Sequence, residues 1–350
     1  MTAIGKIAIV RSYRTCRSCG DAGFPADAVL GLNGSFTRRA RRQICHAGVF
    51  DSFERGESTL RELAGWSVDA ETVRRLCHAE AAVCRQTKAQ RLDVAKHFKK
   101  ASGNWELQID AGKVNTETGW RDVKVATFAV REPGSPSTSA DYEQRDLPKP
   151  SVRHVIASIE TADTFGPRCQ TEAGRVGLPD ATKLTILGDG AEWIWNLASE
   201  RFAEAEQTLD VFHATEYLAD LARAGFGGDA KAAKAWTGRA QTALVADSWA
   251  GVCEFVHQNA AEATDRAALE AAYPRVANYL TGHQGRMNYA ARLRRGESIG
   301  SGLIEGTIKQ NVGRRVKQTG ARWKTTHIGP FVEMISLGHG QEWDDYWSAA

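Results

Sequence analysis

The sequence predicts a mixed α/β core that carries an all-helical insertion. Strand-like segments, rich in β-branched and apolar residues, lie at 105–110, 121–131, 154–159 and 182–189. The chain from Gly190 to Leu280 is rich in Ala and Glu, contains one proline, and is typical of helix. A further helical pattern at 299–318 follows this stretch. Strands followed by many helices and a last basic helix favour an α/β class with an inserted helical unit.

Composition supports a folded, globular chain. The 350 residues are 42% apolar and 25% charged, which argues against disorder. No stretch approaches the roughly 18 consecutive apolar residues of a membrane span, and the apolar run in residues 1–10 is too short for a secretory signal. The seven cysteines are an odd number without a signal, so reduced thiols or a metal site are favoured over disulfides.

The net charge of +3 is unevenly distributed along the chain. Residues 1–100 carry +8, residues 189–285 carry −7 and residues 286–328 carry +8. Two basic blocks on either side of an acidic block indicate a protein that meets a polyanion, such as nucleic acid, at two places. The alternative is ordinary variation of charge along a chain.

The first hundred residues begin irregularly and become helical. Residues 7–10 predict a strand, and a helical pattern starts at Ser58. Gly65 breaks this pattern, and Ser67 or Asp69 can cap the helix that follows. Residues 58–84 therefore have the layout of a helix-turn-helix, whose second helix would present Arg74 and Arg75 to DNA. Two consecutive helices joined by glycine are also common without that function. Residues 85–104 predict a polar linker helix.

Three acidic residues stand where the predicted elements meet. Asp110 ends the first central strand, Asp189 ends the fourth, and Glu305 lies at the start of the basic helix. Carboxylates at the carboxyl ends of strands in one sheet can point into a common crevice. Carboxylates together with substrate phosphates bind Mg²⁺, and two such ions can clamp the oxygens of a phosphoryl transfer. With 42 acidic residues in the chain, a chance trio is the competing interpretation.

Cationic residues follow Glu305 along the basic helix. Arg314, Arg315, Lys317 and Arg322 are candidates for contacts with phosphates, and the alternative is a solvated basic face. Trp323 can either stack on a base or fill the core.

Several short motifs of the sequence resemble motifs of DDE transposases of bacterial insertion sequences, most closely those of the ISKra group. The resemblance spans nearly the whole chain and is carried by Ile109-Asp110, the word LGDGAEWIWN at 187–196, LDVFHA at 209–214, GSGLIEG at 300–306 and GARW at 320–323. It implies a ribonuclease H-like catalytic core with the triad Asp110, Asp189 and Glu305 and two Mg²⁺ (or Mn²⁺) ions per active site. Asp210 and His213 match a family signature whose role is to organise the active site and the transposon end.

The same resemblance extends to the amino-terminal segment. Cys16 and Cys19 look like the second knuckle of a zinc ribbon, but no Cys-x-x-Cys precedes them, and a structural zinc needs four ligands. Family members begin further upstream, so a truncated chain and a degenerate ribbon are both open. Cys45 and His46 are candidates to complete the site. The remaining thiols are expected to be ordinary buried side chains: Cys77, Cys84, Cys169 and Cys253.

The resemblance implies a cytoplasmic, nucleoid-associated bacterial transposase that acts as a homodimer or larger assembly. It would bind the terminal inverted repeats of its element and target DNA, both double-stranded, and no membrane. A non-catalytic or defective transposase-derived DNA-binding protein is the alternative, and a metal-dependent nuclease is a third. The expected divisions are 1–50 (zinc-ribbon-like), 51–104 (helix-turn-helix and linker), 105–212 (catalytic core, first part), 213–285 (helical insertion), 286–335 (catalytic core, last part) and 336–350 (tail).

Overall fold

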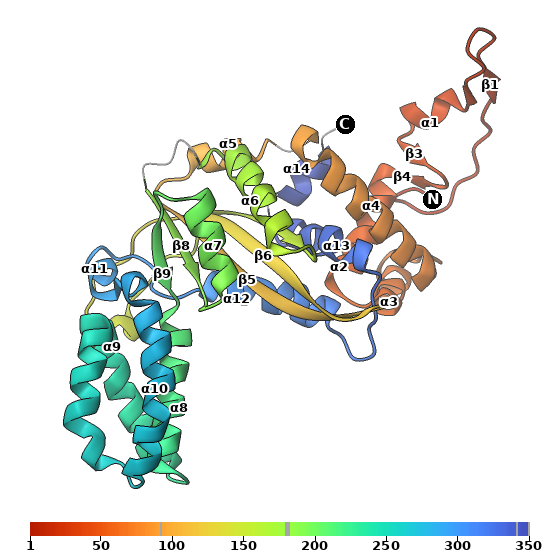
Figure 1. Ribbon diagram of the computed structural model, residues 1–350. Helices are drawn as coiled ribbons and strands as arrows, with labels where there is room; N and C mark the ends of the chain where they lie inside the picture. Colours follow the sequence, from red (N-terminus) through yellow and green to blue (C-terminus); the bar gives the residue numbers. More distant parts are fainter. Residues whose placement is uncertain (92, 179–182, 341, 349–350) are drawn as a thin grey trace.

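The computed structural model describes residues 1–350 except 92, 179–182, 341 and 349–350. A five-stranded mixed sheet forms its centre (Figure 1), in the order β7-β6-β5-β8-β9. β6 is antiparallel to both of its neighbours, whereas β5, β8 and β9 run parallel. The strands are β5 (Asn104–Thr116), β6 (Gly119–Arg131), β7 (Val152–Ser158), β8 (Leu184–Gly188) and β9 (Glu206–Leu209). The predicted mixed α/β class is confirmed.

β5 is longer than the sequence pattern predicts. Its parallel pairing with β8 stops where Ile109 lies opposite Gly188, but its antiparallel pairing with β6 continues to Thr116 and Gly119. The expectation that Asp110 ends a strand is therefore wrong. Asp110 instead marks the point where β5 leaves the parallel ladder and continues as a two-stranded ribbon, because β6 still supplies hydrogen-bond partners there.

Helices cover both faces of this sheet. α6 (Ala162–Val176) and α7 (Glu192–Arg201) pack against one another on one face, and α12 (Gly302–Ile308) and α13 (Thr325–Gly338) lie on the other (Figure 1). The segment predicted as one helix from Ile299 begins at Gly302 instead and continues beyond α12 as a π-helix over Lys309–Val316. Ile304, Val312 and Val316 of this segment are buried, and Gly112 of β5 lets Val312 approach the strand closely.

Three helices form a bundle that projects from the sheet edge (Figure 1). They are α8 (Val211–Phe226), α9 (Ala230–Asn259) and α10 (Arg266–Gly282), and the short α11 (Tyr289–Arg294) follows them. α9 is kinked at Ser248, whose φ is +55° and whose hydroxyl donates to the carbonyl of Met287.

Strand β9 and helix α6 are absent from the sequence prediction. No helix in the described part of the chain is long and apolar enough to cross a bilayer.

The amino-terminal helices pack with the carboxyl-terminal ones. α2 (Arg38–Phe50), α3 (Phe53–Ala64), α4 (Ala70–Arg91) and α5 (Val94–Lys100) precede the sheet, and α14 (Glu342–Ser348) packs on α2 and α4. Gly65 ends α3 with φ +64°, and Asp69 accepts a hydrogen bond from the Thr72 amide at the start of α4, as the pattern predicts. α13 runs across the expected boundary at residue 336, and Trp343, Tyr346 and Trp347 of the carboxyl-terminal segment are buried.

The first 37 residues contain only short elements. They are β1 (Arg14–Thr15), β2 (Ala22–Gly23), α1 (Pro25–Val29), β3 (Leu32–Asn33) and β4 (Phe36–Thr37), and they extend away from the body (Figure 1). The strand predicted at residues 7–10 is wrong. Ile7, Ile9 and Val10 are exposed, because no other strand pairs with this apolar run.

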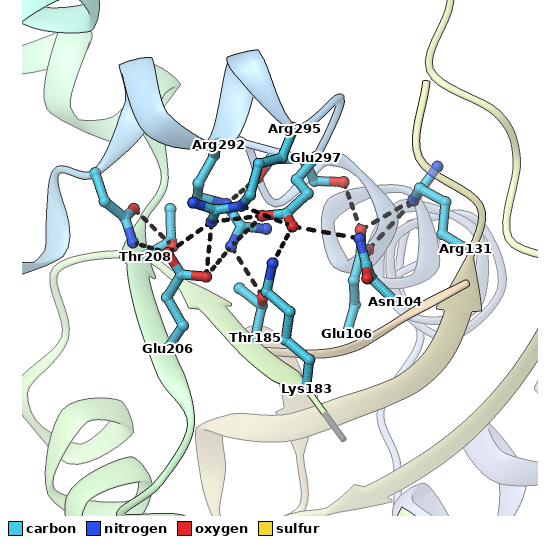
Figure 2. Close-up of polar contacts among 12 residues, drawn as sticks. Asn104, Glu106, Arg131, Lys183, Thr185, Glu206, Thr208, Arg292, Arg295 and Glu297 are labelled. Carbon is cyan, nitrogen blue, oxygen red and sulfur yellow. Dashed lines mark hydrogen bonds and ion pairs between the residues drawn. The ribbon is translucent and has the colours of Figure 1, made fainter. Parts of the chain in front are cut away.

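A network of buried charges lies at the amino ends of the central strands (Figure 2). Arg131 Nε donates to Glu106 Oε1 at 3.0 Å, and both side chains are buried. Arg292 Nη1 contacts Glu206 at 2.9 Å and Glu297 at 3.2 Å. These pairs hold the chain that returns from the helical bundle against β8 and β9. The acidic site described next lies at the opposite, carboxyl ends of the same strands.

Candidate functional site

Asp110 and Asp189 occupy neighbouring positions on adjacent strands. Each directly follows one member of the last parallel pair, Ile109 and Gly188. Asp110 Oδ1 accepts a hydrogen bond from the Ala111 amide at 2.6 Å, and Asp189 Oδ1 accepts one from the Ala191 amide at 2.8 Å. Both side chains are half-buried. The structure therefore brings these two predicted site residues to one edge of the sheet.

Asp210 adds a third carboxylate at this edge. It directly follows β9, and its backbone amide donates to the Gly188 carbonyl at 2.8 Å. The fully buried side chain caps α8 by accepting a hydrogen bond from the Phe212 amide at 2.8 Å. Its second oxygen accepts a hydrogen bond from the Ser301 hydroxyl. Asp210 thus joins the end of the parallel sheet to the start of the helical bundle.

Glu305 and His213 complete a cluster around Asp210. One potential ligand atom of each of the three side chains lies within 4.8 Å of the others, and no second such cluster occurs among the described residues. His213 Nδ1 is 3.5 Å from Asp210 Oδ2. The Ser301 hydroxyl oxygen also lies 3.2 Å from Glu305 Oε1, and because its single hydrogen is given to Asp210, it can accept a hydrogen bond from the protonated Glu305 carboxyl. Ser301 therefore links the two carboxylates, a role that the sequence analysis missed although GSGLIEG contains this residue.

The segment that carries Glu305 is positioned by both the sheet and the bundle. The Ile304 amide donates to Gln108 Oε1 on β5 at 3.1 Å. A Cβ at Gly300 would lie 3.0 Å from the Phe212 ring, so glycine allows the ring to pack closely here. Gly302 and Gly306, by contrast, face open space. The glycines of the GSGLIEG motif therefore permit close packing against Phe212 on one side and leave open space on the side of Gly302 and Gly306.

The charges of the cluster depend on one another. Burial, and then the charge of Asp189, raises the pKa of Asp110 to about 6. Burial alone would raise the pKa of Asp210, but hydrogen bonds from His213, Ser301 and the Phe212 amide lower it below its ordinary value. The hydrogen bond with Asp210 raises the pKa of His213 to about 9. An imidazolium therefore stands among several carboxylates at neutral pH.

The same cluster also determines the protonation state of the Glu305 carboxyl. Burial and then the neighbouring Asp210 raise the pKa of the Glu305 carboxyl. Asp210 keeps its negative charge because His213, the Ser301 hydroxyl and the Phe212 amide all donate to it, which leaves the proton on Glu305. An added cation would favour the ionised form of Glu305.

A tyrosine pair from the bundle faces this edge of the sheet. Tyr279 of α10 stacks on Tyr217 of α8, with ring centroids 3.6 Å apart and an interplanar angle of 8°. A Cβ at Gly190 would overlap the Tyr279 ring, so the residue after Asp189 must be glycine for this approach. Burial and then Tyr217 and Asp189 raise the pKa of Tyr279. No local pattern in the sequence relates these residues, because the fold alone brings them together.

Most of the predicted DNA-contacting cations lie on the surface, away from the acidic cluster. Arg75, Arg314, Lys317 and Arg322 are exposed. Arg74 is half-buried, and its Nε donates to Glu71 Oε2 at 2.7 Å. Arg322 donates to the carbonyls of Thr116 and Glu117, at the tip of the β5–β6 ribbon.

Arg315 and Trp323 have a different place. Arg315 is 3% exposed, and its Nε and Nη2 donate to the Gly48 carbonyl at 3.0 and 2.8 Å. Trp323 is 7% exposed, and its indole N–H donates to the Val316 carbonyl at 2.9 Å. Neither side chain lies on the outer surface, because both fill the space between the π-helix and α3. We therefore correct their expected direct contact with duplex DNA to packing.

The cysteines do not gather into a metal site in the described part of the chain. Cys16 and Cys19 are exposed at the turn between β1 and β2, and no group of three potential ligands includes them. Cys45 is fully buried in α2. The expectation that Cys45 and His46 complete a zinc site is therefore wrong. Of the thiols expected to be buried, Cys77, Cys84 and Cys169 are buried and Cys253 is half-buried.

Comparisons with known proteins give a distant likeness among solved structures. No family model matches the sequence, and no curated protein does. Among solved structures, the chain is similar to the Drosophila P element transposase strand transfer complex, with a TM-score of 0.41 and 10% sequence identity. That alignment covers 89% of this chain and 94% of the other.

Proposed function

We propose that this protein is a DNA transposase that cleaves and transfers DNA strands with the help of divalent metal ions. The observation that carries the proposal is the convergence of four carboxylates and one imidazolium at a single sheet edge. Asp110 and Asp189 follow paired residues of adjacent strands, while Asp210, His213 and Glu305 cluster beside them. The charges of His213, Asp189 and Asp210 all act on Asp110, which couples the two groups. We propose that the sheet is the core of a ribonuclease H-like domain.

The donor set fits a hard divalent cation. Carboxylate oxygens are the ligands that Mg²⁺ and Mn²⁺ prefer. Burial, and then the neighbouring carboxylates Asp189 and Asp210, raise the pKa values of Asp110 and Glu305, and a bound cation would offset both effects by favouring the ionised forms. We propose that Asp110, Asp189 and Glu305 hold the metal. When bound, two such ions supply charge stabilisation at the attacking and leaving oxygens of a phosphoryl transfer.

The other two residues of the cluster position its parts. Asp210 is buried and accepts the hydrogen bond of Ser301, so it fixes the turn from which Glu305 projects. His213 is half-buried and cationic at neutral pH, and it can donate a hydrogen bond to a phosphate oxygen. We propose that Asp210 orients the catalytic acid and that His213 binds the DNA strand beside it.

Binding of DNA would use cations outside the acidic edge. We propose that α3 and α4 form the helix-turn-helix that recognises the terminal inverted repeats, with Arg74 and Arg75 on its second helix. Arg314, Lys317 and Arg322 are exposed and would contact phosphates. Because two ends must be joined to one target, we propose that the active form is a homodimer or a larger assembly.

Replacing Asp189 by Asn tests the proposal. Asp189→Asn should abolish Mg²⁺-dependent cleavage of a duplex that carries the element's end, while binding of that duplex stays unchanged. Asp163→Asn, an exposed position on α6, is the control and should cleave normally. Normal cleavage by Asp189→Asn would refute the assignment. Wild-type protein that binds the duplex but never cleaves it would favour the non-catalytic alternative, and cleavage without joining of pre-cleaved ends would favour a nuclease.

A further inference from the structure

A basic cavity lies between the amino-terminal helices and the end of the π-helix. Its volume is about 490 Å³, which lies within the range of small-ligand pockets. The walls come from the start of α3, from α4, from the loop at residues 318–324 and from the start of α13. The cavity thus brings together residues of the two basic blocks, 1–100 and 286–328, which residues 101–285 separate in the sequence. We call it the Lys324 cavity.

The charge of the Lys324 cavity is strongly positive. One carboxylate, that of Glu54, lies in its wall, and the cationic side chains there are Arg74, Arg315, Arg322 and Lys324. Arg74 is already paired with Glu71, and Arg322 donates to backbone carbonyls. The Lys324 side chain is exposed, and its charge acts on the Glu117 carboxylate, although the two form no direct ion pair among the described residues. A concave, cationic wall of this kind concentrates anions.

Arg315 is a buried cation without a carboxylate partner within the described structure. It donates to a neutral carbonyl, that of Gly48, and its guanidinium lies 4.5 Å from the Phe53 ring centroid and 4.8 Å from that of Phe331. Burial lowers its pKa to about 10. Burying an unpaired charge is costly, and an anion in the adjoining cavity would offset this cost.

His78 provides an independent sign of a missing acceptor. Its side chain lines the Lys324 cavity and is 9% exposed, and its Nε2 is buried without a hydrogen-bond partner in the described part of the chain. The Nη1 of Arg74 lies 3.4 Å from Nδ1 of His78. Because arginine can only donate, Nδ1 is the acceptor and Nε2 carries the hydrogen. Buried donors are nearly always satisfied, so this N–H requires an acceptor.

We propose that the Lys324 cavity binds one phosphate group, a chemistry that a DNA backbone and a free nucleotide share. The Arg315 guanidinium, the Lys324 ammonium and the His78 imidazole N–H come from separate elements, and together they suit the several acceptor oxygens of a phosphate. His327, which stacks on His78 with centroids 4.2 Å apart, closes the wall beside them. The proposal rests on the proposed function only in taking DNA as one source of the phosphate.

Titration calorimetry on the full-length protein tests this site. The ligands are inorganic phosphate, deoxyadenosine 5′-monophosphate and a DNA duplex. Lys324→Glu should weaken binding of phosphate and of the nucleotide by about tenfold or more. Lys234→Glu, an identical change at an exposed position on α9, is the matched control and should bind as wild type does. His78→Phe keeps an aromatic ring against His327 but removes the donor, and it should weaken binding in the same direction.

The ligands distinguish the two sources of phosphate. If Lys324→Glu weakens binding of the free nucleotide, the cavity is a nucleotide site. If the loss is confined to the duplex, the cavity binds a backbone phosphate. Either outcome supports the cavity as a phosphate site. The proposal is overturned if no ligand distinguishes Lys324→Glu from Lys234→Glu. These assays need no strand cleavage. A protein that binds phosphate here but never cleaves DNA would refute the proposed function alone, and one that cleaves DNA with an inert cavity would refute this inference alone.

Discussion

Replacing Asp210 by Ala should show how strongly the acidic cluster ties the helical bundle to the sheet. The change removes the cap of α8, which is worth about 1 kcal/mol, and leaves the buried Ser301 hydroxyl without one acceptor, about 1 kcal/mol more. It also removes the partner that raises the pKa of His213 from 6.5 to about 9. That shift corresponds to about 3 kcal/mol if taken at face value. Because the His213 side chain is 34% exposed, solvent screening reduces it to roughly 1 kcal/mol.

Removing Asp210 also relieves its repulsion of Glu305, which returns part of this loss. We therefore expect Asp210→Ala to lower the free energy of unfolding by about 2 kcal/mol near pH 6. The pKa of His213 is raised in the folded protein, so its stabilisation is complete below pH 6.5 and is lost as the pH rises through about 9. The difference between variant and wild type should consequently shrink between pH 6.5 and pH 9.5.

Urea unfolding in EDTA, followed by far-UV circular dichroism, measures this difference. Asp229→Ala is the matched control, because Asp229 caps α9 through the Ala232 amide at 2.9 Å but is exposed. It should lose only the cap, about 1 kcal/mol at every pH. The reasoning is refuted if the two variants lose the same stability, or if NMR titration of Asp210→Ala still gives His213 a pKa near 9.

Two further predictions concern the sheet. The pKa of Asp110 is raised in the folded state to about 6, so its ionisation removes stability as the pH rises from 3.8 through 6. Asp110→Asn should therefore be more stable than wild type at pH 8 in EDTA by roughly 1–2 kcal/mol and equal to it below pH 3.8, and calorimetric melting that shows no gain at pH 8 would contradict this. Arg131→Met leaves the Glu106 carboxylate buried and unpaired, so urea unfolding should show a loss of about 3–5 kcal/mol. Lys113→Met breaks the exposed pair with Asp122 on the same two strands and should cost under about 0.5 kcal/mol, so equal losses would rule out the buried-pair argument.

The sequence predicts those parts of the fold whose signals are local. The turn at Gly65 and the cap at Asp69 come from residue types that have few alternatives, and both are present. The strand at residues 7–10 fails because an apolar run becomes a strand only if a partner strand exists elsewhere. β9 is missed for the converse reason: three of its four residues, Glu206–Leu209, are polar, and pairing with β8 makes them a strand.

The candidate site is predictable to a similar extent. Asp110 and Asp189 become neighbours because two strands pair, which their positions at predicted strand ends already suggested. Ser301 and Tyr279 acquire their places only when the bundle has folded back onto the sheet. The burial of Arg315 had no signal at all, since the rings that surround its guanidinium come from α3, α13 and the loop after the π-helix.

The helical bundle leaves and rejoins the sheet at one place. The Val211 amide donates to the Ile299 carbonyl at 3.1 Å, so the outgoing and returning chains lie side by side. Asp210 directly precedes Val211, where the chain enters the bundle, and Ser301 lies two residues after Ile299, where the chain has returned to the sheet. α8 extends about 24 Å away from the sheet, and both chains that connect the bundle to the sheet pass beside the acidic cluster. A change in the position of the bundle would therefore displace Asp210 and the segment that carries Glu305 together.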